Sequence, residues 1–282
     1  MKLIMTLLVR DEEDILKENI DFHLSQGVDF IIATDNCSID STKTILQEYE
    51  KRGLLHYIYE KEDNYNQHKW VTRMARLALL KYQADWIINN DADEFWWSKK
   101  HKNLKEAFNS IQNKYNIVEA KRSNFIPFEE MNPNRIFYQE MIYREYESLN
   151  PIGKPLPPKQ AHIALKNIRV NQGNHSVEGI ENKKIIEDLI EIFHFPIRNK
   201  KQLLNKINKG GAAYAKNTEL SKNIGNTWRK LYAELQKNGN LNDYFNQNIY
   251  TEEELKKGLK ENHILKDTRL KEYLNQLKSL ES

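Results

Sequence analysis

The chain of 282 residues contains a single cysteine, Cys37, and no long apolar run. One cysteine excludes an internal disulfide framework and is typical of a reducing compartment. A membrane-spanning helix needs about 18 or more consecutive apolar residues, so we expect no membrane span. The apolar segment at residues 3–9 is too short for a signal peptide, lacks a small-residue cleavage site and is followed at once by RDEED. We interpret it as a buried first strand.

An excess of charge of either sign is also missing. The chain has 43 basic and 40 acidic residues, which gives a net charge of +3, and we therefore predict no nucleic-acid binding. A hydrophobic content of 39% and a charged content of 29% are typical of a rather polar globular protein. This length predicts one large domain, or a domain with an appendage. We expect a cytoplasmic location.

The first part of the chain alternates between strand-like and helix-like patterns. Each predicted strand is a short apolar run, and each predicted helix has apolar residues at helical spacing. This order predicts an α/β fold with a mostly parallel, doubly wound sheet flanked by helices. The predicted strands are residues 3–9, 30–34, 55–59 and 85–89, and the predicted helices are residues 12–26, 42–51 and 70–82.

The second part of the chain is less regular. Residues 127–158 contain several prolines and asparagines and predict a long surface loop, with an acceptor-side loop as one interpretation. From Lys200 onward the chain is predicted to be helical, and residues 252–280 form one amphipathic helix or a pair. Packing on the core is the first interpretation of this tail, with dimer formation or contact with acidic lipid headgroups as alternatives. A helix is also predicted at 104–115, and strands at 117–125, 161–165, 168–170 and 185–195.

The segment WIINNDADEF at residues 86–95 is the most informative in the chain. An apolar strand ends in an acidic turn, and because strand side chains alternate between faces, Asp91 and Asp93 are expected to point the same way. Two such carboxylates repel each other unless a cation lies between them, and Mg²⁺ or Mn²⁺ prefers oxygen ligands. The alternative interpretation is a solvated acidic turn.

Polar segments follow three of the predicted strands: VRDEED at residues 9–14, DNCSIDST at 35–42 and NDADE at 90–94. In a doubly wound sheet the carboxyl ends of parallel strands border one ligand crevice. Asp35 is suited to accept hydrogen bonds from a base or a ribose, and Arg10 offers a phosphate fork. Ser38, Asp40 and Ser41 offer hydroxyl or carboxylate groups, although Asp40 or Ser41 can equally be a helix N-cap.

These three segments together resemble glycosyltransferases of the GT-A fold, specifically the family 2-like group. The resemblance covers LVRDEEDIL (8–16), DNCSIDST (35–42) and DWIINNDADEF (85–95), with a weaker second block of KQAH (159–162), GNHSV (173–177) and HFPIR (194–198). Residues 10–12 stand where many members have Lys-Asn-Glu, and Ser41 stands where glycine is common. The resemblance implies a nucleotide-sugar-binding half (1–97) and an acceptor half (98–200) of a domain at 1–200, with a helical extension at 201–282.

In such enzymes the acidic motif holds a divalent metal ion on the diphosphate of a nucleotide sugar. The resemblance implies Mn²⁺ or Mg²⁺ on Asp93 and Asp91, with His175 as a third ligand because neutral imidazole is a common metal ligand. The alternative for His175 is an ordinary turn residue, and His194 is interpreted as a core histidine. The residues that the resemblance places around the nucleotide sugar are Val9, Arg10, Glu12, Asp35, Ser38, Lys69, Arg73, Asp91 and Arg198.

Family 2-like enzymes invert the anomeric carbon and need a general base on the acceptor hydroxyl. The candidates are Glu129, Glu130 and Glu178, each of which can equally be an ordinary surface carboxylate. Residues 96–97, two tryptophans, offer a sugar-stacking platform or core packing.

The resemblance therefore implies an inverting, metal-dependent hexosyltransferase with a UDP- or GDP-type donor. The implied acceptor is a saccharide or lipid-linked molecule in bacterial surface polysaccharide synthesis, with peripheral membrane contact possible. One rival, a nucleotidyltransferase, would need a glycine-rich loop after the first strand, where the chain has RDEE. The other is a catalytically degenerate nucleotide-sugar-binding or scaffold protein of the same fold. The donor sugar, the acceptor and the oligomeric state stay open.

Overall fold

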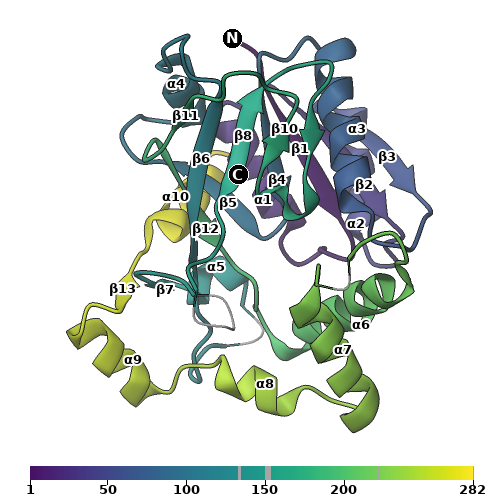
Figure 1. The fold of residues 1–282 in the computed structure, drawn as a ribbon. Helices are drawn as coiled ribbons and strands as arrows, with labels where there is room; N and C mark the ends of the chain where they lie inside the picture. Colours follow the sequence, from purple (N-terminus) through teal and green to yellow (C-terminus); the bar gives the residue numbers. More distant parts are fainter. Residues whose placement is uncertain (133–134, 150–153, 222, 282) are drawn as a thin grey trace. The chain divides into compact units, whose positions relative to one another are not determined.

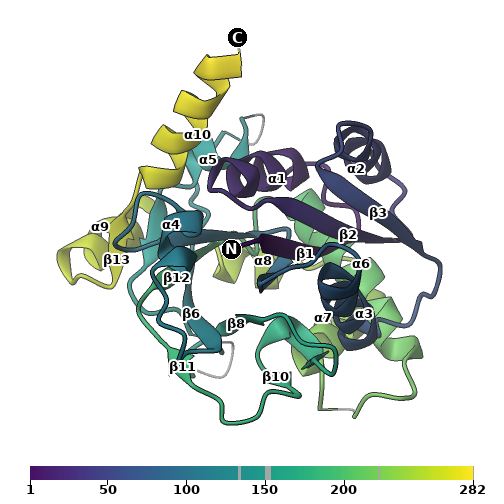
Figure 2. The same cartoon turned by 90° about the horizontal axis from the view of Figure 1, so that it is seen from above.

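Four parallel strands form the amino-terminal part of one sheet in the computed structural model of the protein (Figure 1). They are β1 (Leu3–Val9), β2 (Phe30–Asn36), β3 (Leu55–Glu60) and β4 (Trp86–Asp91), in the order β3-β2-β1-β4. The connecting helices are α1 (Leu16–Ser25), α2 (Thr42–Lys51) and α3 (Gln67–Leu80). Figure 2 shows α1 and α2 on one face of these strands and α3 on the other, which buries β1 on both faces. The α/β class with a mostly parallel sheet is confirmed.

The structure describes residues 1–132, 135–149, 154–221 and 223–281. Parts of the predicted surface loop at 127–158 therefore lie outside the described residues. The chain divides into two compact units. We call residues 1–62, 66–122 and 156–193 the sheet unit, and residues 63–65, 123–155 and 194–282 the helical unit.

The sheet becomes mixed beyond β4. Strand β8 (Lys159–Ile163) lies antiparallel between β4 and β6 (Ile117–Asn124). Beyond β6 the order continues with β12 (Ile190–His194) and β5 (Glu94–Ser98), while β11 (Ile185–Ile186) pairs with β6. Because β8 runs against β4, its first residue lies near the carboxyl end of β4. A small hairpin of β9 (Arg169–Val170) and β10 (Val177–Glu178) encloses the short helix η1 (Gln172–Asn174).

Three elements differ from the sequence prediction. The strand expected at 185–195 is divided into β11 and β12, because Asp188 has a φ of 58°, which interrupts an extended chain. The helix expected at 104–115 ends early as α4 (Leu104–Asn109), where the Ser110 hydroxyl donates to the carbonyl of Ala107 at 2.7 Å. Strand β5, directly after the acidic turn, was not predicted.

The two adjacent tryptophans of β5 pack in the sheet unit. Trp96 is fully buried, and the ring of Trp97 stacks between Phe22 at 5.8 Å and Phe193 at 5.4 Å. Of the two interpretations offered by the sequence, the structure supports core packing. Aromatic rings held on both sides in this way also fix β5, and with it the acidic turn that precedes it.

The helical unit contains α6 (Lys200–Lys216), α7 (Asn226–Asn238), α8 (Asn242–Gln247), α9 (Glu252–Lys260) and α10 (Arg269–Glu281). It also contains α5 (Phe137–Glu140) and the antiparallel pair of β7 (Tyr143–Glu145) and β13 (Ile264–Lys266). Helices α6 and α7 pack closely because Gly210 and Gly211 face Trp228 and Tyr232, where a Cβ would lie 2.5 Å from either side chain. Among the described residues no helix is long and apolar enough to cross a membrane.

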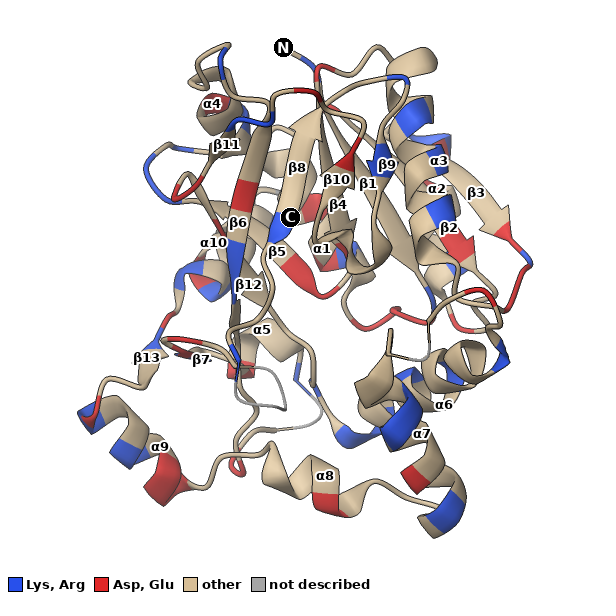
Figure 3. Cartoon of the chain, viewed as in Figure 1, with Lys and Arg blue, Asp and Glu red and all other residues tan. Residues whose placement is uncertain are grey.

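The tail predicted as one amphipathic helix or a pair is the pair α9 and α10, with β13 between them. Thr251 and Glu254 form a capping box at the start of α9. Figure 3 shows the acidic beginning and the basic end of this helix, an arrangement that suits the helix dipole.

His23 of α1 lies fully buried in the sheet unit, with both ring nitrogens hydrogen-bonded. The neutral ring donates from Nδ1 to the carbonyl of Asn19 at 2.8 Å and accepts at Nε2 from the backbone N–H of Trp96 at 3.3 Å. Burial lowers the pKa of His23 to about 4. Protonation would therefore break the bond to Trp96 and leave a buried charge.

We expect the free energy of unfolding to fall as the pH is lowered from 6.5 towards 4, since in this range the unfolded chain binds a proton that folded His23 does not. The contribution of His23 is about 3 kcal/mol. In His23→Gln, which keeps a donor and an acceptor, chemical denaturation between pH 7 and pH 4.5 should show a correspondingly shallower pH dependence. An identical pH dependence in both proteins would contradict this role.

Candidate active site

The ends of β1, β2 and β4 are neighbours in the sheet. Val9 pairs with Asp35 on one side, and Leu8 pairs with Asp91 on the other. Neighbouring strands lie about 4.8 Å apart, so the backbone positions of Asp35 and Asp91 are separated by about 10 Å across the end of β1. The segments that the sequence predicted to share one edge of the sheet do so.

The loops after β1 and β2 are hydrogen-bonded to each other. The backbone N–H of Asp11 donates to the Ser38 hydroxyl at 3.0 Å, and the N–H of Ile39 donates to the Asp11 carboxylate at 2.7 Å. The N–H of Glu12 donates to the Thr42 hydroxyl at 2.9 Å. Ser38 therefore holds the two loops together.

Asp35 is completely buried at the end of β2. One carboxylate oxygen accepts from the backbone N–H of Ser38 at 3.0 Å, and the other accepts from the hydroxyl of Tyr57 at 3.2 Å. Burial and the Asp35 carboxylate raise the pKa of Tyr57, so the phenol stays a donor. In this structure Asp35 shapes the loop that follows β2, and Tyr57 is a partner that the sequence analysis did not identify.

The side chain of Asn19, on α1, forms hydrogen bonds that fix the acidic turn. Its amide donates to the carbonyl of Ala92 at 2.9 Å and to that of Glu94 at 2.8 Å, and its oxygen accepts from the Asn90 amide at 3.0 Å. Asn19 is fully buried. One amide thus fixes both ends of the turn and the strand that leads into it.

Strand β4 ends at Asp91, and Asp93 lies in the turn. We expected Asp91 and Asp93 to share a face because side chains alternate along a strand. That reason is wrong, because the strand, and with it the alternation, ends at Asp91. The direction of Asp93, which is 5% exposed, is set by the turn that Asn19 holds.

The Asp91 carboxylate is contacted by three side chains from separate segments. Oδ1 accepts from the Asn174 amide at 3.1 Å and from the Gln67 amide at 3.4 Å. Oδ2 is ion-paired with the ammonium of Lys159. Gln67 also accepts from the backbone N–H of Gly173 at 2.8 Å, which connects the start of α3 to the η1 loop.

Lys159 is shared between two carboxylates. Its Nζ lies 3.2 Å from Oε1 of Glu94, and the side chains of Lys159 and Glu94 are 2% and 1% exposed. Arg122 approaches the same Glu94 oxygen at 3.4 Å. Burial raises the pKa of Glu94 to about 7, although Lys159 and Arg122 oppose the rise. The acidic turn is therefore part of a buried cluster of positively and negatively charged side chains. We call Asp91, Glu94, Arg122 and Lys159 the charge cluster.

His175 lies beside this cluster and is neutral. Its Nδ1–H donates to the carbonyl of Pro158 at 2.9 Å, which leaves the lone pair on Nε2. Burial, together with the positive charges of Lys159 and Arg122, lowers the pKa of His175 to about 4. A metal-binding histidine usually has its other N–H bonded in this way.

The residues present fit a divalent cation in part. Mg²⁺ is usually held by one or two carboxylates together with substrate phosphates, as Asp91 and Asp93 would allow. Within the described chain, the buried oxygens Oδ1 of Asn174 and Oε2 of Glu94 accept no hydrogen bond. However, no group of three or more His, Cys, Asp and Glu residues there is arranged to hold a metal ion, so His175 is not gathered with the two aspartates.

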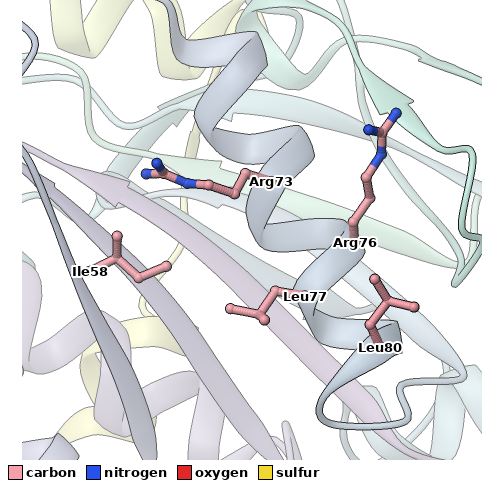
Figure 4. Close-up of a pocket in the computed structure, with 5 residues that line it drawn as sticks. All are labelled: Ile58, Arg73, Arg76, Leu77 and Leu80. Atoms are coloured by element: carbon pink, nitrogen blue, oxygen red, sulfur yellow. The ribbon is translucent and has the colours of Figure 1, made fainter.

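Other predicted site residues are more exposed or belong to the other unit. Lys69 and Arg73 are on exposed positions of α3, and Arg73 pairs with Glu60 at 3.0 Å. A pocket of about 460 Å³ lies between α3 and Ile58 of β3. Figure 4 shows Arg73 and Arg76 extending from α3 in different directions, with Arg73 on the side of Ile58. Glu178, on β10, is exposed in the sheet unit.

Three further predicted residues, Glu129, Glu130 and Arg198, belong to the helical unit. Glu129 and Glu130 are exposed, whereas Arg198 is 4% exposed and donates to the carbonyl of Phe195 at 3.2 Å. Their parts in catalysis or binding stay predictions.

Several residues that contact the acidic turn, Asp35 or the charged side chains around them were not assigned a role from the sequence. They are Asn19, Tyr57, Gln67, Glu94, Arg122, Lys159 and Asn174. Three of them were within reach, since Glu94, Lys159 and Asn174 lie inside the motifs DADEF, KQAH and GNHSV. The others come from positions whose residue types are common in any helix or loop, and only the fold brings them together.

A family model for glycosyltransferase family 92 matches residues 5–278, which include every residue of the cluster. The chain belongs to glycosyltransferase family 92. The prediction of a glycosyltransferase is thereby confirmed, and the family shown is family 92. The finer resemblance to the family 2-like group stays a prediction. A search of curated proteins finds no match.

Among solved structures, this family 92 chain is similar to S. aureus TarS 1–349 in complex with UDP-GlcNAc, with 12% identity, a TM-score of 0.44, and coverage of 84% of this chain and 72% of TarS 1–349. It is also similar to glucosyl-3-phosphoglycerate synthase from Mycobacterium tuberculosis in complex with Mg²⁺ and UDP, with 15% identity, a TM-score of 0.31 and coverage of 43% of each chain. At these values the similarities add nothing to the family assignment.

We expect Asn19→Ala to lower the free energy of unfolding by about 3 kcal/mol, because it removes three hydrogen bonds and leaves buried carbonyl groups unpaired. Glycosyltransferase activity should fall as well, since the acidic turn loses its support. The matched control is Lys17→Ala on the exposed side of α1, where we expect a change within about 0.5 kcal/mol. Urea denaturation checks both, and equal effects of the two substitutions would contradict the role given to Asn19.

Proposed function

We propose that the protein transfers a hexosyl group, with inversion, from a UDP- or GDP-type nucleotide sugar to a saccharide or lipid-linked acceptor. The observation that carries this proposal is the pairing of Val9 with Asp35 and of Leu8 with Asp91. The loop shaped by Asp35 and the end of β4 at Asp91, where the acidic turn begins, lie about 10 Å apart at one end of the sheet. This spacing suits a nucleoside at the first position and its diphosphate at the second.

The sides of the proposed nucleotide site come from the loops after β1 and β2. Val9 ends β1, and Arg10, Glu12 and Ser38 belong to these loops. The bonds from the Asp11 N–H to Ser38 and from the Glu12 N–H to Thr42 fix the backbone against which a base and a ribose would lie. In this proposal Asp35 acts by holding the loop in shape, as its bonds to Ser38 and Tyr57 support.

At the other end of the nucleotide, Asp91 and Asp93 would hold Mn²⁺ or Mg²⁺, and the metal ion when bound would neutralise the leaving diphosphate. Lys159 and Arg122 add positive charge beside the turn. Glu129, Glu130 and Glu178 stay the candidates for the general base. The GT-A assignment, a role in surface polysaccharide synthesis and a cytoplasmic location are likewise predictions.

The test is thermal unfolding with UDP, GDP, CDP and dTDP, each with Mn²⁺ and with EDTA. A nucleotide at a hundredfold excess over its Kd should stabilise the protein by about 2.7 kcal/mol, because it binds the folded state alone. We expect UDP or GDP to do so with Mn²⁺, and Asp93→Ala to lose the effect.

A matched control is Asp188→Asn, which changes an exposed carboxylate outside the cluster at a position with positive φ that asparagine tolerates. It should respond to nucleotides as the unaltered protein does. If no nucleotide stabilises the protein with or without the metal ion, donor binding fails. A catalytically degenerate member of the family then becomes the better account.

A further inference from the structure

The ammonium of Lys159 lies at Asp91, one of the two carboxylates on which the sequence pattern predicted a metal ion. It forms ion pairs with Asp91 and Glu94, the first and last acidic residues of the turn. The position follows from the topology. Strand β8 runs antiparallel to β4, with Ala161 opposite Ile88, so that Lys159 reaches the carboxyl end of β4.

Lys159 is held firmly in this place. Its side chain is 2% exposed, and a buried ammonium is costly unless carboxylates surround it. If the Lys159 ammonium moved away from Asp91, the carboxylates of Asp91 and Glu94 would face each other without a positive charge between them. In the absence of a ligand, the stable arrangement is therefore the one in which Lys159 neutralises both carboxylates.

A divalent cation at the same carboxylate competes with this ammonium. Oδ2 of Asp91 is occupied by Lys159, and Oδ1 already accepts from Asn174 and Gln67. A divalent cation and the Lys159 ammonium on the same carboxylate would repel each other, because little water lies between them to screen the charges. A nucleoside diphosphate would bring negative charge that offsets this repulsion.

We propose that Lys159 is a positioning residue that keeps Asp91 from binding a divalent metal ion alone, so that the metal ion enters the site only together with a nucleoside diphosphate. The statement about the diphosphate rests on the proposed function. The competition between Lys159 and a metal ion for Asp91 rests on the observed ion pairs alone.

The experiment measures the binding of Mn²⁺ alone, with no nucleotide, from the electron paramagnetic resonance signal of free Mn²⁺. Lys159→Met preserves the length of the side chain and removes its charge. We expect it to bind Mn²⁺ at least about tenfold more tightly than the unaltered protein. Damage to the fold would weaken binding, so an increase cannot arise from a merely structural role.

Lys159→Met leaves Glu94 buried beside Arg122 alone, and this variant can fail to fold. The double variant Lys159→Met with Glu94→Gln removes both members of the buried ion pair, and it should show the same increase in Mn²⁺ affinity. Adding Asp91→Asn to either background should abolish the increase, because the carboxylate that Lys159 covers is then gone.

Arg122→Met is the matched control. It removes an equal charge that pairs with Glu94, and the Arg122 guanidinium is directed to Glu94 and to the carbonyl of Pro157 rather than to Asp91. If the net positive charge near the site decides metal affinity, Arg122→Met and Lys159→Met will raise Mn²⁺ affinity equally. If Lys159 acts by occupying Asp91, Arg122→Met will change Mn²⁺ affinity by less than about threefold.

Three results would overturn the proposal: equal Mn²⁺ affinity in the unaltered protein and both Lys159 variants, equal increases for Arg122→Met and Lys159→Met, or no Mn²⁺ binding by any variant. Failure of the proposed function looks different. In that case Mn²⁺ affinity rises in Lys159→Met as expected, while no nucleoside diphosphate stabilises the unaltered protein in the thermal panel.

Discussion

The burial of charge at the carboxyl end of β4 is the constraint on which the site depends. Glu94 and Lys159 are almost inaccessible to water, and Asp93 is 5% exposed. Buried ions are stable only when paired and hydrogen-bonded, so the surrounding chain must supply cations and amide groups in fixed positions. Lys159, Arg122, Asn174 and Gln67 meet this requirement, and they come from four separate elements.

The same constraint connects the fold to the chemistry. Asn19 holds the backbone of the turn, and Trp96 and Trp97 fix the strand that follows it. A turn fixed on both sides presents its carboxylates without the entropic cost of ordering them when a ligand arrives. Membership of glycosyltransferase family 92 connects these preorganised charges with glycosyl transfer. In the proposed function they would stabilise the leaving diphosphate of a nucleotide sugar.

Much of the sheet unit was predictable because its signals are local. The apolar runs of β1 to β4 and the periodicity of α2 and α3 gave the element types and their order, and the parallel topology followed from that order. Boundaries failed where one residue overrides a pattern, as at Asp188 with its positive φ and at Ser110 with its side-chain bond. Strand β5 was not predicted because it begins at Glu94, within the acidic segment, where the sequence is typical of a turn.

The sequence by itself determined that acidic and polar segments end three neighbouring parallel strands, because strand order follows from patterns along the chain. The resemblance of its motifs to a known family implied a glycosyltransferase, and the family model bears this out. Only the tertiary structure decided which charges meet. Lys159 is 68 positions from Asp91, and it reaches that carboxylate because β8 enters the sheet antiparallel beside β4. Antiparallel pairing across such a distance depends on the packing of the whole sheet, which no local pattern encodes.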